Sequence, residues 1–281
     1  MNRQFPYDQL YIYFLNARVN REDESFLGDE FIGNWVEGET SFLFFNTSSD
    51  ANVSRLLGMR PELRVIDQYR MDYEQWQGGA LYPLYLGEFV IVPPWQAEGV
   101  KRRGKTIILD PGVVFGNGLH PTTQHCLHAL SFLRQSFRFR RVADLGTGTG
   151  VLAVACGLVG AEKVLAADLN PLCTRTAHRN VDLNRLSQVI EVVEGNALDV
   201  SFEKVDLVIA NIHYDVLHGL LDRDDFRRVP WIIISGLMRS QVREVRQQLK
   251  TYEMPIMREW DHEMTWYTIL AGGRRMHDAK E

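Results

Sequence analysis

The sequence predicts an α/β fold: a Rossmann-like, doubly wound sheet preceded by a smaller, β-rich N-terminal module. Three observations lead to this fold. An apolar strand at 142–145 runs into a glycine-rich turn and a helix, and the next strand, 163–167, ends at Asp168. From Arg141 to about residue 250, short apolar strands alternate with helical segments. Strands and helices that alternate over short loops form a parallel sheet with helices on both faces.

Each element has its own local signal. Strands are predicted where short apolar runs lie between polar turns, at 105–109, 142–145, 163–167, 188–193, 205–210, 231–234 and 263–270. Two helices are predicted to start with a proline, which suits the first turn, and a third carries alternating charges on its exposed face; they span 121–134, 171–184 and 239–250. The aromatic, β-branched strand at the end of the chain completes the sheet as part of a hairpin.

The first part of the chain shows a different sequence pattern. Strand-like runs at 10–15 and 41–45 are separated by acidic turns that contain glycine, and Gln77-Gly78-Gly79 marks a hinge. We therefore expect an N-terminal β-rich module at 1–78, with a possible role in substrate recognition, and a second domain at 79–281.

Bulk composition narrows the class of protein. The 281 residues are 45% hydrophobic, with a formal net charge of −5. No run approaches the roughly 18 apolar residues of a membrane span and no secretory segment follows Met1–Pro6, so we expect a cytoplasmic protein without membrane contact. The longest basic cluster lies at 101–105, which indicates no direct nucleic-acid binding. Because the cysteines are isolated, we expect neither disulfide nor metal at Cys126, Cys156 and Cys173.

The glycine turn indicates which cofactor the fold holds. Gly146, Gly148 and Gly150 follow the pattern G-x-G-x-G, whereas dinucleotide-binding proteins use G-x-G-x-x-G to approach a pyrophosphate. Asp144 adds an acid that opposes a pyrophosphate but suits the cationic amino and sulfonium groups of S-adenosylmethionine. The spacing therefore favours a methyl donor over a dinucleotide.

Two further polar residues follow neighbouring strands. Asp168 ends the second strand of the βαβ unit, and the carboxyl ends of parallel strands meet at one edge of a sheet. Asn196 follows the third strand, where an amide oxygen can accept the adenine amino group; a turn asparagine beside Gly195 explains it equally well.

The loop from Leu109 to Thr123 is rich in glycine and proline and leads into a helix that begins at Pro121. Thr122 and Thr123 lie in its first turn, where their hydroxyls and free amides can face a ligand carboxylate. A capped helix after a long turn is the alternative interpretation of the same residues.

This loop, the glycine turn after it, and the pair Asn211-Ile212 closing the fourth strand together resemble the PrmA-type family, lysine methyltransferases that act on the eleventh protein of the large ribosomal subunit. The resemblance covers about residues 85 to 270 and includes Gly87–Trp95. It implies a class I methyltransferase that uses S-adenosylmethionine and releases S-adenosylhomocysteine.

By that resemblance, Thr123 contacts the methionine end of the cofactor, Gly146 its backbone side, Asp168 the ribose hydroxyls, and Asn211 the region where the methyl group passes. Together with the residues discussed above, the predicted cofactor-binding set is Phe115, Thr122, Thr123, Asp144, Gly146, Gly148, Gly150, Asp168, Asn196 and Asn211. The chain departs from the family pattern after Asn-Ile, and its N-terminal part shows no clear match to the family's recognition module.

Asn211 through Tyr214 also resembles, in part, the Asn-Pro-Pro-Tyr loop of amino-group methyltransferases, in which an amide accepts a hydrogen bond from the nitrogen being methylated. Methyl transfer needs a neutral amine with its lone pair aimed at the methyl group. The predicted catalytic residues are Asn211 for orientation, His213 as a base and Tyr214 as an aromatic wall. A histidine in a solvated loop is the plainer interpretation of His213.

The function predicted is methylation of a protein lysine or N-terminal amine, with a protein as substrate and a ribosomal protein as one candidate. Two alternatives stay open: a small-molecule amine methyltransferase, and a non-catalytic protein that binds the cofactor or a partner. The sequence leaves open which molecule accepts the methyl group, how many methyl groups it receives, and the oligomeric state.

Overall fold

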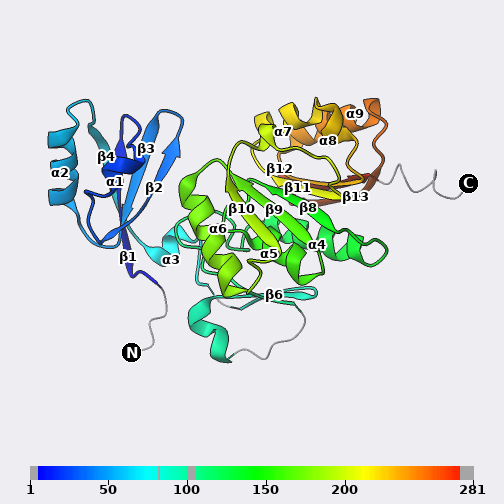
Figure 1. Cartoon of the computed structure of the whole chain (residues 1–281), viewed down its shortest axis with the longest axis horizontal. Helices are drawn as coiled ribbons and strands as arrows, with labels where there is room; N and C mark the ends of the chain where they lie inside the picture. Colours follow the sequence, from blue (N-terminus) through cyan, green and yellow to red (C-terminus); the bar gives the residue numbers. More distant parts are fainter. Residues whose placement is uncertain (1–5, 82, 100–104, 273–281) are drawn as a thin grey trace, which may run out of the picture. The chain divides into compact units, whose positions relative to one another are not determined.

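The computed structural model describes residues 6–81, 83–99 and 105–272. The chain forms two compact units, Met1–Tyr82 and Pro83–Glu281 (Figure 1). The boundary expected from the sequence, after residue 78, lies in the loop that precedes this division.

The N-terminal unit is one antiparallel sheet with helices in its crossovers. Its strands lie in the order β2-β3-β1-β4. One crossover joins β1 to β2, with β3 between them, and the other joins β3 to β4, with β1 between them. This is the ferredoxin-like, split βαβ arrangement. The elements, in chain order, are β1 (Gln9–Leu15), α1 (Arg21–Glu24), β2 (Phe31–Glu37), β3 (Thr40–Phe45), α2 (Asp50–Met59), β4 (Val65–Asp72) and α3 (Tyr73–Trp76).

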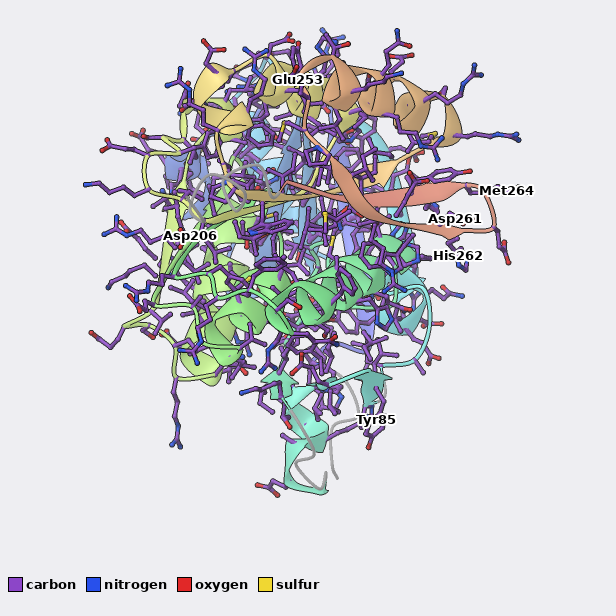
Figure 2. All side chains as sticks on the ribbon, turned by 90° about the vertical axis from the view of Figure 1, so that its right-hand side faces the viewer. Tyr85, Asp206, Glu253, Asp261, His262 and Met264 are labelled. Carbon is purple, nitrogen blue, oxygen red and sulfur yellow. The ribbon has the colours of Figure 1, made fainter. Side chains whose placement is uncertain are left out.

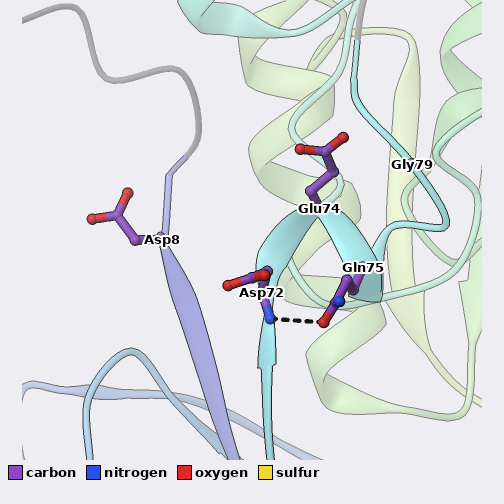
Figure 3. A pocket seen from close by; sticks show the side chains of 5 residues that line it. All are labelled: Asp8, Asp72, Glu74, Gln75 and Gly79. Carbon is purple, nitrogen blue, oxygen red and sulfur yellow. Dashed lines mark hydrogen bonds between the residues drawn. The ribbon is translucent and has the colours of Figure 1, made fainter.

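The β-rich module expected from the sequence is confirmed, and its helices are an addition. Helix α2 contributes only Val53 and Leu56 to the buried core, because its remaining residues are mostly polar or small. No helix is predicted from the sequence in this part of the chain. An open pocket of about 570 Å³ also lies in this unit, lined by Asp8, Asp72, Glu74, Gln75 and Gly79 (Figure 3).

The second unit contains the doubly wound sheet predicted from the sequence. Its strands lie in the order β10-β9-β8-β11-β12-β14-β13, and the first five are parallel, whereas β14 is antiparallel to both neighbours. Their bounds are β8 (Arg141–Leu145), β9 (Lys163–Asp168), β10 (Ile190–Glu194), β11 (Leu207–Asn211), β12 (Trp231–Leu237), β13 (Ile256–His262) and β14 (Trp266–Gly272).

Helices cover both faces of this sheet (Figure 1). One face carries α4 (Pro121–Arg134), α5 (Val151–Leu158) and α6 (Pro171–Leu183), and the other α7 (Tyr214–Leu221), α8 (Asp224–Arg227) and α9 (Arg239–Thr251). Because successive residues of a strand point to opposite faces of the sheet, each strand contributes side chains to the apolar core on either face. In β11, Leu207 and Ile209 pack with α4 and α5, whereas Val208 and Ala210 pack with α7 and α9.

A three-stranded sheet precedes α4 and leads into the loop that the sequence analysis singled out. It consists of β5 (Leu84–Leu86), β6 (Phe89–Val92), which is followed by the short helix η1 (Pro94–Gly99), and β7 (Lys105–Ile108). Phe89, Ile91 and Ile107 are buried in the same core as α4. Strand β7 thereby fixes the start of the loop that leads to α4.

The C-terminal hairpin differs in detail from the strand expected at 263–270. Residues 263–265 form the turn, and β14 starts only at Trp266. Glu263 and Met264 have φ of 50° and 55°, a left-handed backbone that no strand adopts. Figure 2 shows Asp261, His262 and Met264 together at the outer end of the hairpin.

Candidate active site

The residues predicted to hold the cofactor follow the carboxyl ends of neighbouring parallel strands. Gly146 follows β8, Asp168 ends β9, Asn196 lies just after β10, and Asn211 ends β11. The strand register aligns these ends, since Leu145 pairs with Ala167 and with Ala210. One edge of the sheet therefore carries these four segments, as the sequence predicted.

All three glycines of the turn have positive φ, at 65°, 55° and 81°. A different segment of the protein closes on each of them. A Cβ at Gly146 would lie 2.2 Å from Ile212 Cγ2, and one at Gly148 would lie 2.6 Å from the carbonyl oxygen of Phe115. A Cβ at Gly150 would lie 3.2 Å from Ala177. The packing of the chain itself thus requires glycine here, in addition to any demand that a ligand makes.

Asp144 holds the turn from beneath. Its side chain is buried, and Oδ2 accepts hydrogen bonds from Thr147 Oγ1 at 2.6 Å and from the Ala153 amide at 3.0 Å. Burial raises the pKa of Asp144 to about 6, against the lowering effect of these two bonds. The Asp144 side chain thus contacts the glycine turn and α5. That it also lies beside the cationic groups of a bound cofactor stays a prediction.

Asp168 joins the turn to the next crossover. Its Oδ2 accepts from the Gly148 amide and its Oδ1 from the Asn170 amide, both at 2.9 Å. Burial raises the pKa of Asp168, while these two amides act in the opposite direction. These two hydrogen bonds fix the Asp168 carboxylate at the edge of the sheet. The sequence predicts that this carboxylate binds the ribose hydroxyls.

The loop before α4 packs directly on the glycine turn. The amide of Thr149 donates to the carbonyl oxygen of Phe115 at 3.1 Å, and its hydroxyl donates to that of Gly116 at 2.7 Å. Asn180, fully buried in α6, donates to the carbonyl oxygens of Thr149 and of Asp110. The Asp110 amide donates back to Asn180 at 2.8 Å. One side chain thus ties the start of the loop to the turn.

The start of α4 lies beside the end of β11. His120 caps the helix, and its Nδ1 accepts from the Thr122 amide at 3.4 Å and lies 2.7 Å from Thr122 Oγ1. Asn211 Nδ2 donates to the same hydroxyl at 3.2 Å. The Thr123 amide donates to the His120 carbonyl oxygen at 3.1 Å. The expectation of free amides in this turn is therefore wrong, since the chain itself engages both.

Hydroxyl groups of the sheet also contact the first turn of α4 at Thr122. The hydroxyl of Ser235 in β12 donates to the Thr122 carbonyl oxygen at 3.3 Å and lies 2.6 Å from the hydroxyl of Thr268 in β14. Both side chains are fully buried. Thr268 Oγ1 lies 3.4 Å from His125 Nδ1, farther along α4.

The loop after β11 is more open. His213 is exposed at the N-terminal end of α7. The Tyr214 hydroxyl donates to Glu244 Oε2 in α9 at 2.6 Å, and burial together with this carboxylate raises the pKa of Tyr214 to about 12. That hydrogen bond leads from α7 to α9. The roles of His213 as a base and Tyr214 as an aromatic wall stay predictions.

Two more of the predicted residues are exposed. Asn196 Oδ1 accepts from the Leu198 amide at 3.0 Å and so caps a short helix, η2 (Ala197–Asp199), as the turn interpretation expected. Phe115 is 76% exposed. Leu169, which follows Asp168, is 71% exposed and was not foreseen. Across the described residues, no cluster of three or more potential metal ligands occurs, and no helix is long and apolar enough to cross a membrane.

Sequence reasoning missed the partners that hold the site together. Ile212 against Gly146 and Asn180 against Thr149 act through contacts between segments distant in the chain, whereas His120 contacts Thr122 two residues further on. One signal was available for His120: a residue with a side-chain acceptor directly before Pro121 can cap a helix.

Comparisons with known proteins identify relatives of this chain. A family model described as ribosomal protein L11 methyltransferase (PrmA) matches residues 50–273. A ribosomal protein L11 methyltransferase of Desulforamulus reducens is 36% identical over 197 residues, which cover 68% of this chain and 63% of that protein. One from Listeria monocytogenes is 34% identical over 209 residues, which cover 72% of this chain and 65% of that protein.

The solved structure of a ribosomal protein L11 methylase from Lactobacillus delbrueckii subsp. bulgaricus is similar as well. It superposes with a TM-score of 0.60 at 28% identity and covers 69% of this chain and 99% of that one. The matched part spans somewhat less than two thirds of the curated relatives' length. The family model alone covers well over half of the chain, and the chain therefore belongs to the ribosomal protein L11 methyltransferase (PrmA) family.

Proposed function

We propose that this protein transfers a methyl group from S-adenosylmethionine to an amine of a protein, with ribosomal protein L11 as the acceptor to test first. One observation carries the proposal: the amide of Asn211, at the end of β11, is held by Thr122 at the same sheet edge as the glycine turn. The residue predicted to accept a hydrogen bond from the amine and the turn predicted to bind adenosine thus follow neighbouring strands. Family membership supports both the donor and the class of acceptor.

The residues present fit S-adenosylmethionine. Asp168 offers a fixed carboxylate to ribose hydroxyls, and Leu169 and Phe115 offer exposed apolar surfaces to the adenine ring. The Gly146–Gly150 turn would let its backbone approach a bound ligand. Thr122 and Thr123 lie at the end where the methionine group is expected.

The cofactor, when bound, supplies a methyl group on a positively charged sulfur. The chain's own part in the reaction is to orient the amine. Asn211 Oδ1 accepts an N–H of the neutral amine, which leaves the nitrogen lone pair free to point along the line of transfer. The product amine is cationic and loses its proton to water or to a base, a role for which the exposed His213 is the predicted candidate.

Binding measurements test the donor. Titration calorimetry with S-adenosylmethionine should show saturable binding, and titration with NAD should not. Asp168→Ala removes the ribose partner and should weaken binding by about tenfold to a hundredfold. Asp182→Ala, an exposed acid on α6, is the matched control and should bind as the wild type does. Saturable NAD binding, or unchanged affinity in Asp168→Ala, would contradict the proposal.

Transfer of labelled methyl groups tests the acceptor. Label should enter purified L11 and, in a cell lysate, a protein of the same mass. Label found only in small amines would favour a small-molecule methyltransferase instead. Tight cofactor binding without any transfer would favour a non-catalytic binding protein.

A further inference from the structure

A chain of three hydrogen-bonding side chains leads from solvent to the predicted amine acceptor. His120 Nδ1 lies 2.7 Å from Thr122 Oγ1, and Asn211 Nδ2 lies 3.2 Å from the same oxygen. The members come from the α4 cap, the first turn of α4 and the end of β11. We propose that His120 is a positioning residue that sets, through the Thr122 hydroxyl, which end of the Asn211 amide faces the substrate amine. This proposal rests on the proposed function.

The direction of each hydrogen bond follows from the cap. Because Nδ1 of His120 accepts the Thr122 amide at 3.4 Å, it carries no proton, and the ring is the tautomer protonated at Nε2. The Thr122 hydroxyl must then donate to Nδ1. Only its lone pairs are left for Asn211, so the NH₂ end of that amide turns toward Thr122. The opposite end is Oδ1.

The surroundings of Asn211 agree with this orientation. A Cβ built at Gly236, which follows the paired residue Ser235 in β12, would lie 3.1 Å from Asn211 Oδ1. The oxygen therefore lies beside Gly236, near the carboxyl ends of β11 and β12. An amide oxygen in that place can accept an N–H of an amine, whereas an NH₂ group cannot.

Protonation of His120 would reverse the chain. With a proton on Nδ1, the ring donates to Thr122 Oγ1, and the Thr122 hydroxyl proton is free to point at Asn211. The favoured partner is then the amide oxygen, so the amide turns over and presents NH₂ to the substrate. An amide NH₂ group cannot accept a hydrogen bond, so the N–H of the substrate amine loses its acceptor.

The groups around His120 favour its neutral form. Burial lowers the pKa of His120, and His262 on the neighbouring β13 lowers it further. The Trp266 ring of β14 packs edge-on at 5.1 Å and brings no charge. His125, on α4 itself, also has a lowered pKa, caused first by burial and then by His128 and His262, while Asp261 acts in the opposite direction. Near neutral pH the chain thus presents Asn211 Oδ1.

The test compares two substitutions of His120 with a matched control. His120→Ala removes the acceptor, whereas His120→Asn keeps a capping oxygen that can accept the Thr122 hydroxyl and cannot be protonated. His128→Asn makes the same change at an exposed histidine of α4. With purified L11 as acceptor, kcat should fall by about tenfold or more in His120→Ala, while the Kd for S-adenosylmethionine stays within about threefold. His120→Asn should restore most of kcat, and His128→Asn should match the wild type.

The pH profile separates positioning from mere folding. Amine ionisation gives every variant the same acid-side slope, so the ratio of the wild-type to the His120→Asn profile isolates His120. That ratio should fall below the pKa of His120 and be flat above it. A flat ratio throughout, a kcat in His120→Ala equal to that in His128→Asn, or equal losses in His120→Asn and His120→Ala would overturn the proposal.

A measurement without turnover keeps this proposal distinct from the proposed function. Long-range proton–nitrogen correlation spectra should show His120 Nδ1 unprotonated at neutral pH, and the Asn211 NH₂ signals should shift in His120→Ala. A protonated Nδ1 at neutral pH would overturn the orientation argument. If the wild type transfers no methyl group to any amine but these spectra are as expected, the proposed function fails while the hydrogen-bond chain stands.

Discussion

The two sides of the site are built differently. On the donor side, Gly146–Gly150, the backbone is held by Asp144, Asp168, Asn180 and the loop before α4, through contacts that are buried or half-buried. On the acceptor side, Asn211–Tyr214, the residues are half-buried or exposed, and their side chains form hydrogen bonds with Thr122 and Glu244. The donor side is therefore fixed by the fold before any ligand binds, whereas the acceptor side depends on the state of a few polar groups.

The largest effect should come from closing the space at Gly146. Gly146→Ala should destabilise the folded state by about 1–2 kcal/mol because alanine disfavours a left-handed backbone. The overlap of its Cβ with Ile212 should destabilise it by about 1–3 kcal/mol more. Denaturant unfolding should show both, and calorimetry should show loss of cofactor binding. Gly160→Ala is the control, because its φ is also positive but nothing lies within 4 Å of the new Cβ. Equal losses in the two variants would mean that Ile212 yields freely and that the donor side is less rigid than described.

The buried carboxyl beneath the turn should make stability depend on pH. Asp144 has its pKa raised from an ordinary 3.8 to about 6, so between these values the folded state binds the proton more tightly than the unfolded state does. Its contribution is fully present below about pH 4 and is lost as pH rises through about 6, an effect of roughly 2–3 kcal/mol. Asp168 contributes with the same sign.

Comparison with Asp144→Asn isolates this effect. The free energy of unfolding of the wild type, measured by denaturant titration between pH 4 and pH 7, should fall more steeply with rising pH than that of the variant. Identical slopes would show that Asp144 titrates normally and is not desolvated by the fold.

The smallest effect should come from the acceptor side. Tyr214→Phe removes the hydroxyl bond to Glu244, which is exposed, and should cost at most about 1 kcal/mol of stability. If the ring forms a wall of the amine pocket, kcat should change by less than about twofold in Tyr214→Phe but fall clearly in Tyr214→Ala. Equal kcat values in the wild type, Tyr214→Phe and Tyr214→Ala would show that the ring does not line the amine pocket.

How far the sequence predicted the structure follows the same division. The fold and the donor side carry local signals: glycines at fixed spacing, an acid at a strand end, prolines at helix starts. The hydrogen bonds from Asn211 to Thr122 and from Asn180 to Thr149 join segments distant in the chain, so no local sequence pattern predicts them. In the hairpin, Glu263 and Met264 adopt a left-handed turn without glycine or asparagine, so a strand was expected there.

The most direct test of the account is the mass of purified L11 after incubation with S-adenosylmethionine and either the wild type or Asn211→Ala. The account predicts methylated L11 with the wild type, and a large loss of methylation with Asn211→Ala even when S-adenosylmethionine is saturating for each protein. Unmodified L11 with a wild type that binds the cofactor, or equal methylation by both proteins, would contradict it.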